Sequence, residues 1–149
     1  MRGLRCQRGY TVAEMVTVAG IIAGLTAIAV PSLTTLNKET GLPSAQREIM
    51  GALYLARSSA ITYNAQRVVT INPSTKVIQI TDQAGTTTFY TRNLNGYAGI
   101  SVDGSNTITV TFDSRGLLTP ANNVTINLNG TSSQRKSITV YATGKAAAS

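Results

Sequence analysis

The chain has 149 residues, enough for one small domain and an attached helix but not for two independent hydrophobic cores. It contains 13 Lys and Arg against 6 Asp and Glu, a formal net charge of +7, and no histidine. Its one cysteine, Cys6, lies near the start, so the remainder has no disulfide and no Cys or His metal ligand. These absences exclude Ser-His-Asp and Cys-His catalysis. We therefore expect neither an enzyme nor a metal or cofactor site.

Residues 1–9 form a short basic segment. Arg2, Arg5 and Arg8 supply three positive charges, so the remainder carries 13 − 3 = 10 Lys and Arg against 6 Asp and Glu, a net charge of +4. This scattered excess weakens the inference of a nucleic-acid partner that a basic chain otherwise suggests. By the positive-inside rule, the arginines hold this end of the chain in the cytoplasm. We interpret residues 1–9 as a processing leader.

An apolar segment follows the leader. No residue from Met15 to Asn37 carries a formal charge, and roughly the first 16 span about 24 Å as a helix, close to the ~30 Å of a hydrocarbon core. We predict a transmembrane helix over residues 10–36 and a periplasmic globular domain over residues 37–149. Glu14 lies just inside the apolar segment. A carboxylate costs about 2.5–3.5 kcal/mol at the centre of a membrane helix, so we expect Glu14 to have a cationic partner.

The stretch from Arg8 to Glu14, followed by the apolar segment, resembles the N-terminal signal of bacterial type IV pilins and pseudopilins. The resemblance implies that a prepilin peptidase cuts between Gly9 and Tyr10 and N-methylates Tyr10. Glu14 and Pro31 then occupy the positions of the family's glutamate and helix-kinking proline. The family's mode of assembly implies a single-pass inner-membrane precursor whose helix later packs against other pilins in a filament. There Glu14 would neutralise a Tyr10 amine, its own or a neighbour's.

Two other interpretations of this segment stay open. Ala27-Ile28-Ala29 has the A-x-A form that precedes a conventional signal-peptidase site, which would make the mature chain start at Val30. Against that, Glu14 interrupts the apolar region, which also runs directly into Pro31. Alternatively, Glu14 is a surface carboxylate that reaches water and has no partner.

Beyond the apolar segment we expect a bend or break and then an amphipathic helix. Asn37–Pro43 contains two helix breakers, and Ser44 is a suitable N-cap. The amphipathic helix of about 20 residues should end near Asn64. Its apolar face needs a sheet to cover it and consists of Ile49, Leu53, Ala56 and Ala60.

After Arg67 apolar residues recur at every second position instead of about every 3.6 positions, which predicts strands. Seven short runs at this spacing favour two small antiparallel sheets, or one curled sheet, packed on the amphipathic helix. The predicted fold class is α+β, with a long N-terminal helix on small antiparallel sheets. The runs are Val69–Asn72, Val77–Thr81, Thr86–Tyr90, Ile100–Val102, Ile108–Phe112, Val124–Leu128 and Ile138–Tyr141.

Three stretches of the globular part are similar to GspH/FimT-type minor pilins and pseudopilins: Leu53–Asn64, Phe112–Gly116 and Ile138–Lys145. The resemblance implies a structural subunit that helps to initiate or cap a filament. That filament is either a type IV pilus or a type II secretion pseudopilus, because this branch of the family occurs in both.

DNA binding is the alternative function. Some FimT-like minor pilins bind DNA during natural transformation through a G-R-x-R tail, and the matching stretch here is Gly144–Ala147, in which Lys145 keeps one charge. Arg135 and Lys136, before the last predicted strand, would add charge. Two or three lysine or arginine contacts to phosphates give only weak, salt-sensitive binding. We expect a solvated turn and tail instead.

Overall fold

The computed structural model describes residues 10–97 and 99–149, except for the side chains of residues 28–39 and of Ser132. The predicted leader therefore lies outside the described residues. The chain divides into two compact units, Met1–Leu36 and Asn37–Ser149. A single helix, α1 (Val12–Thr62), contributes residues to both units.

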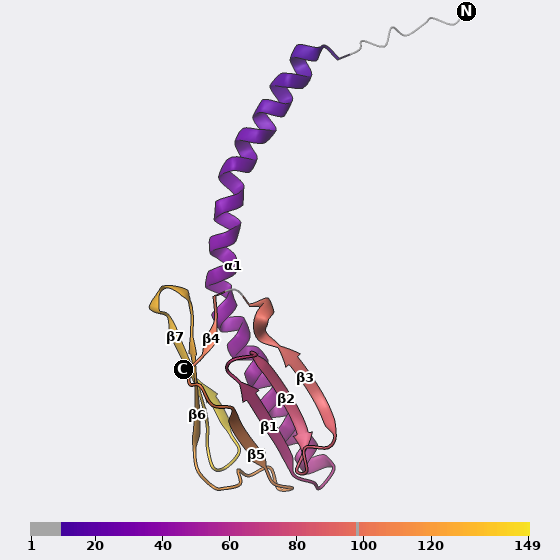
Figure 1. Cartoon of the computed structure of the whole chain (residues 1–149), viewed down its shortest axis with the longest axis vertical. Coiled ribbons are helices and arrows are strands. Elements are labelled where there is room, and N and C mark those ends of the chain that lie inside the picture. Colours follow the sequence, from indigo (N-terminus) through magenta and orange to yellow (C-terminus); the bar gives the residue numbers. More distant parts are fainter. Residues whose placement is uncertain (1–9, 98) are drawn as a thin grey trace, which may run out of the picture. The chain divides into compact units, whose positions relative to one another are not determined.

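In the second unit, two four-stranded antiparallel sheets pack with the C-terminal part of α1 (Figure 1). The strand order is β3-β2-β1-β5 in the first sheet and β4-β6-β7-β8 in the second. Two short 3₁₀ helices, η1 and η2, precede β4 and β7. The bounds are β1 Arg67–Asn72, β2 Val77–Asp82, β3 Thr88–Asn93, η1 Leu94–Gly96, β4 Ser101–Val102, β5 Ile108–Phe112, β6 Val124–Asn129, η2 Thr131–Ser133, β7 Arg135–Val140 and β8 Ala146–Ala148.

The helix and both sheets share one hydrophobic core. Buried helix side chains recur every three or four residues, and β1, β2, β5, β6 and β7 contribute alternate residues, as the two periods require. Four of the buried helix residues are alanines, which lets the strands approach the helix closely. The α+β prediction is confirmed, in its two-sheet form. The buried helix residues with apolar side chains are Leu42, Ala45, Ile49, Ala52, Leu53, Ala56 and Ala60.

Of the bend or break predicted over Asn37–Pro43, the break does not occur. The helix α1 continues through this stretch, and Ser44 lies inside it instead of capping a second helix. Leu42 is 2% exposed and Ala45 is fully buried, so packing against the sheets compensates for the backbone hydrogen bond that Pro43 cannot donate. The helix ends at Thr62, close to the predicted end.

All seven predicted runs contain strands. The largest shift of a strand start is at β7, which begins at Arg135 instead of Ile138. The strand β3 starts at Thr88 instead of Thr86, because the backbone N–H and Oγ1 of Thr86 donate to the Asp82 carboxylate in the preceding turn. The prediction of a solvated tail is wrong for Ala146–Ala148, which pairs with β7 as β8. Ala146 is 4% exposed and belongs to the core.

Candidate functional site

The N-terminal end of α1 is capped by Thr11. The Thr11 Oγ1 accepts a 3.3 Å hydrogen bond from the backbone N–H of Glu14, and the Thr11 carbonyl accepts from Glu14 and Met15. A threonine at the N-cap followed three residues later by glutamate is the sequence pattern of a capping box. This pattern is readable from the sequence, although the prediction for Glu14 rested on its charge and on its place in the pilin signal. Glu14 therefore lies in the first helical turn, where the helix dipole favours a negative charge.

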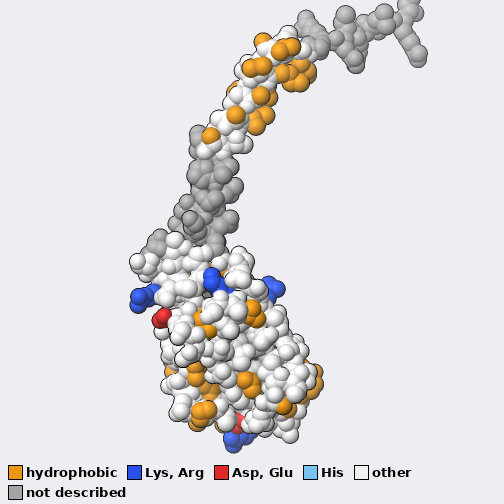
Figure 2. All heavy atoms as spheres, viewed as in Figure 1, with side chains coloured by type: hydrophobic (Ala, Val, Ile, Leu, Met, Phe, Trp, Pro, Cys, Tyr) orange, Lys and Arg blue, Asp and Glu red, His pale blue; other side chains and the backbone are white. Residues whose placement is uncertain are grey.

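The first turns of α1 present an exposed apolar surface. Residues 10–27 are all exposed, and Val12, Val16 and Leu25 are 81%, 66% and 64% exposed. Figure 2 shows the apolar side chains of this segment spread along the helix. Gly20 and Gly24 have no atom within 4 Å of an added Cβ, so another backbone has room to approach there. A soluble protein rarely exposes a contiguous apolar surface of this kind, and such a surface marks a protein or membrane interaction.

Within the described part of the chain, no helix is long and apolar enough to cross a membrane. Of the other residues predicted to act in processing and assembly, Gly9 lies outside the described residues. Tyr10 is 79% exposed and lies just ahead of the Thr11 cap. Pro31 lies within α1, but its side chain is outside the described set.

The three stretches that resemble GspH/FimT-type proteins come together at Arg57. This side chain comes from α1, and its Nε donates to the Gly116 carbonyl at 3.1 Å. Its Nη2 donates to the Thr143 carbonyl at 3.2 Å. One guanidinium thus joins the helix to the turn after β5 and to the turn between β7 and β8. These contacts are structural, because both acceptors are backbone carbonyls.

Gly116 and Gly144 make this arrangement possible. Their φ angles are +77° and +76°, in the left-handed region that favours glycine. A Cβ on Gly144 would overlap the carbonyl oxygen of Gly116, and a Cβ on Gly116 would lie 2.7 Å from Cδ1 of Ile61. The two turns therefore approach each other too closely for a side chain at Gly144, and Gly116 lies against the Ile61 and Arg57 side chains of the helix.

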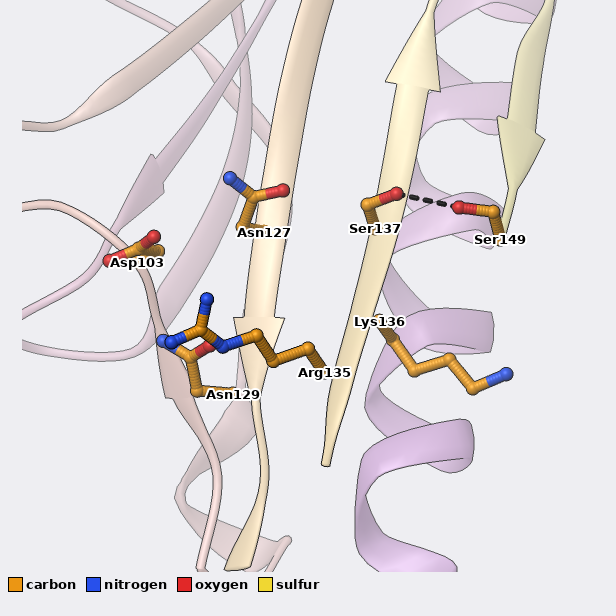
Figure 3. A pocket seen from close by; sticks show the side chains of 7 residues that line it. All are labelled: Asp103, Asn127, Asn129, Arg135, Lys136, Ser137 and Ser149. Carbon is orange, nitrogen blue, oxygen red and sulfur yellow. Dashed lines mark hydrogen bonds between the residues drawn. The ribbon is translucent and has the colours of Figure 1, made fainter. Parts of the chain in front are cut away.

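The three cations of the DNA alternative do not form one cluster. Arg135 and Lys136 are consecutive in β7, so their side chains leave opposite faces of the sheet, and Figure 3 shows Arg135 over Asn129 while Lys136 points away. Lys145 lies beyond the other end of β7, where its carbonyl accepts from the N–H of Tyr141. At the rise of an extended strand, Lys136 and Tyr141 are roughly 16 Å apart.

Glu48 joins α1 to β3 and η1. Its Oε1 accepts a 2.7 Å hydrogen bond from the Tyr90 hydroxyl and lies 3.0 Å from Nε of Arg92. Its Oε2 accepts from the Tyr97 hydroxyl at 3.3 Å. Burial, and next the hydrogen bond to Glu48, raises the pKa of Tyr90, which keeps the phenol protonated as a donor. The cluster fastens an edge strand to the helix.

The described residues contain no group of three or more Cys, Asp or Glu side chains placed to hold a metal ion. The chain has no histidine to serve as a general base. The geometry therefore consists of structural contacts in the second unit and an exposed apolar helix surface in the first.

Comparison with known proteins assigns the family. The family model of the type II transport protein GspH matches residues 45–144. The chain belongs to the GspH family. The matched range contains Arg57, Gly116 and Gly144, so it spans the contacts described above. Proteins of the GspH family are structural subunits and not enzymes, and the resemblance to GspH-type minor pilins and pseudopilins is confirmed.

The fold of this GspH-family chain is similar to that of a type IV minor pilin, FimU of Pseudomonas aeruginosa. One FimU crystal structure matches with a TM-score of 0.64 and 17% identity, over 76% of this chain and 92% of that chain. A second crystal form matches with a TM-score of 0.62 and 17% identity, over 72% and 92%. At this identity the likeness concerns the fold alone. No curated protein matches the sequence.

Proposed function

We propose that this chain is a minor pilin or pseudopilin that helps to initiate or cap a type IV pilus or a type II secretion pseudopilus. Its precursor is a single-pass protein of the bacterial inner membrane, with residues 1–9 in the cytoplasm and residues 37–149 in the periplasm. A prepilin peptidase cuts between Gly9 and Tyr10 and N-methylates Tyr10. The N-terminal part of α1 then packs among the helices of other pilins.

The observation that supports this proposal is the exposed apolar surface over the first turns of α1 in a chain of the GspH family. Burying apolar surface contributes about 25 cal/mol per Å². A helix exposed on all sides from Val12 to Leu25 therefore gains stability by entering a bilayer or a bundle of similar helices. Gly20 and Gly24 leave room for a neighbouring backbone.

Glu14 then acts in assembly by pairing with the α-amino group of Tyr10, its own or that of a neighbouring subunit. Two opposite charges that pair in an apolar environment avoid the cost of burying either one alone. Pairing between subunits would fix their stagger. Pro31 removes one backbone donor from the helix, so the helix can bend where it leaves the bilayer.

The helix cap gives this proposal a sharp test, because charge and capping can be removed separately. Glu14→Gln keeps a residue that suits the third position of a capping box but removes the charge. Thr11→Ala removes the cap but keeps the charge. We expect Glu14→Gln and Glu14→Val to lower the amount of the protein in sheared filaments at least tenfold, and Thr11→Ala to leave it near the wild-type amount.

The reverse result, with Thr11→Ala lost from filaments and Glu14→Gln retained, would assign Glu14 to helix capping and contradict the charge-pairing role. The mature N-terminus checks the processing step independently. Mass spectrometry should find a chain that starts at N-methylated Tyr10. A chain that starts at Val30 would instead identify a conventional signal peptide.

DNA capture has less support, because Lys145 lies at the opposite end of β7 from Arg135 and Lys136. Mobility-shift assays with duplex DNA at low salt test it, comparing wild type with Lys145→Gln, Arg135→Gln and Lys136→Gln. A shift that each substitution weakens would support DNA capture. The absence of a shift would exclude it.

A further inference from the structure

A polar depression of about 250 Å³ lies on the solvent-facing side of the second sheet (Figure 3). Its floor follows the strand register: Asn127 of β6 is opposite Ser137 of β7, and Asn129 is opposite Arg135. Asp103, directly after β4, donates its N–H to the Asn127 carbonyl. Because alternate residues share one face of a sheet, these side chains gather outside while their neighbours fill the core.

The hydrogen-bonding groups of this depression are mostly unused within the protein. In the described part of the chain, the side chains of Asn127, Asn129 and Arg135 make no hydrogen bond, and the only ion pairs join Arg92 to Glu48 and Arg115 to Asp113. Oδ1 of Asp103 accepts from the adjacent Gly104 N–H. The Ser137 and Ser149 hydroxyls bond each other at 2.7 Å. Guanidinium and amide donors, with amide and carboxylate acceptors, therefore face one concavity.

The lining excludes several classes of ligand. No apolar or aromatic side chain lines the depression, so it offers nothing to an apolar molecule or to a stacked nucleobase. Asp103 is the one carboxylate among the lining side chains, which is too few for a dedicated calcium site. Arg135 and Lys136 also line it, so the depression holds two cations against one carboxylate and suits a ligand with an isolated negative charge. What fits is a ligand with many hydroxyl groups that both donate and accept hydrogen bonds.

We propose that this depression binds an oligosaccharide that carries a carboxylate. The planar fork of Arg135 matches a carboxylate with two parallel hydrogen bonds. Asn127, Asn129 and Asp103 offer the donors and acceptors that sugar hydroxyls require. This inference goes beyond filament assembly and does not depend on it.

The volume of the depression limits how much of an oligosaccharide it can hold. At about 250 Å³ it is smaller than the roughly 300–1,000 Å³ clefts that enclose drug-sized ligands, so one or two sugar rings occupy it while the rest of the chain lies over the sheet. Without an aromatic platform, affinity rests on hydrogen bonds that compete with water. We expect a Kd of about 1 mM, corresponding to roughly −4 kcal/mol.

Saturation-transfer NMR on the full chain tests this proposal with tri-galacturonate and neutral maltotriose as probes. The chain is kept in a zwitterionic detergent without a sugar headgroup, because alkyl glycosides would compete. We expect saturable binding of tri-galacturonate and at least about tenfold weaker binding of maltotriose. Arg135→Gln should weaken tri-galacturonate binding about tenfold or more, since a hydrogen-bonded charge is lost. Asn127→Ala should weaken both sugars.

Lys145→Gln is the matched control, because it removes the same charge at the far end of β7. It should leave both affinities unchanged. Arg135→Gln should keep the wild-type thermal melting curve, since the Arg135 side chain makes no hydrogen bond or ion pair with the described residues. The proposal is overturned by the absence of saturable binding, by equal affinity for both trisaccharides, or by equal losses in Arg135→Gln and Lys145→Gln. Displacement of tri-galacturonate by an equimolar single-stranded oligonucleotide would also overturn it and assign the face to nucleic acid.

Discussion

The backbone of Gly144 lies against the backbone of Gly116. Replacing Gly144 by alanine introduces both steric overlap and backbone strain, and a control glycine distinguishes the two. Alanine at φ +76° pays about 1–2 kcal/mol for the left-handed conformation. Its Cβ would also overlap the Gly116 carbonyl that accepts from Arg57, and relieving such overpacking costs a further 1–3 kcal/mol or so. We predict that Gly144→Ala lowers the free energy of unfolding by about 2–5 kcal/mol, measured by urea denaturation.

Gly85 is the control for this substitution. Its φ is +71°, yet no atom lies within 4 Å of an added Cβ. Gly85→Ala should therefore cost only the conformational part, about 1–2 kcal/mol. Equal losses in the two variants would mean that the turns can separate and that the close approach contributes nothing to stability.

Asp113 makes stability depend on pH. The backbone N–H of Leu117, and with a smaller effect the side chain of Arg115, lowers the pKa of Asp113 below its ordinary 3.8. A lowered folded-state pKa gives stability that is present above the unfolded pKa and lost as the pH falls through the folded one. We predict that Asp113→Asn is less stable than wild type at pH 7, and that the difference disappears below the folded-state pKa of Asp113.

Urea midpoints measured from pH 7 down to about pH 3 check this prediction. Arg115→Gln should show the same pH dependence with a smaller difference, because the Leu117 N–H is the stronger cause. A constant gap between Asp113→Asn and wild type across the range would contradict the ionic origin of the effect.

Some of the residue-scale detail was readable in advance. The Thr11-x-x-Glu14 spacing alone identifies a helix cap. The contacts of Arg57 were not readable, because the carbonyls that it binds are 59 and 86 residues away in the sequence. The presence of an arginine in a helix does not indicate which atom its guanidinium binds or which way its side chain points. Sequence motifs located the three family stretches, and only the fold shows that they touch.

Among the elements, β8 departs most from expectation. Three alanines have weak strand propensity and no alternation of apolar and polar residues, so the sequence carries no strand signal at Ala146–Ala148. The strand forms because β7 offers it backbone partners and the core accepts Ala146. The break predicted over Asn37–Pro43 is absent for a related reason. Burial of Leu42 outweighs the low helix propensity of this stretch. The other strands were predictable because their alternation is strong.

The burial of β8 leads to a paired prediction. Ala146→Asp places a carboxylate in the core, where Ala146 is 4% exposed, and should destabilise the protein by about 3 kcal/mol or more. Ala148→Asp introduces the same side chain at an exposed position of the same strand and should change stability by less than about 0.5 kcal/mol. Thermal melts of the two variants compare them directly. Similar melting temperatures would mean that the tail does not belong to the cooperative fold.

For the molecule as a whole, the buried residues lie in one unit. All described core side chains, from Leu42 to Ala146, fall within Asn37–Ser149. We predict that a chain that starts at Asn37 folds alone, with one cooperative urea transition and a midpoint close to that of the full chain. A broad transition, or a midpoint far below that of the full chain, would show that the preceding helix supports the domain.

The two hydrogen bonds from Gln46 have a consequence for the order of events during synthesis of the chain. Its Nε2 donates to the carbonyls of Ser137 and Ser149, 91 and 103 residues further along the chain. Contacts of such separation form only after a large loop has closed, and they slow folding. The domain therefore cannot complete its core before residues near 146 have been synthesised. Until then the apolar face of the helix is exposed, and a chaperone that covers it would act in that interval.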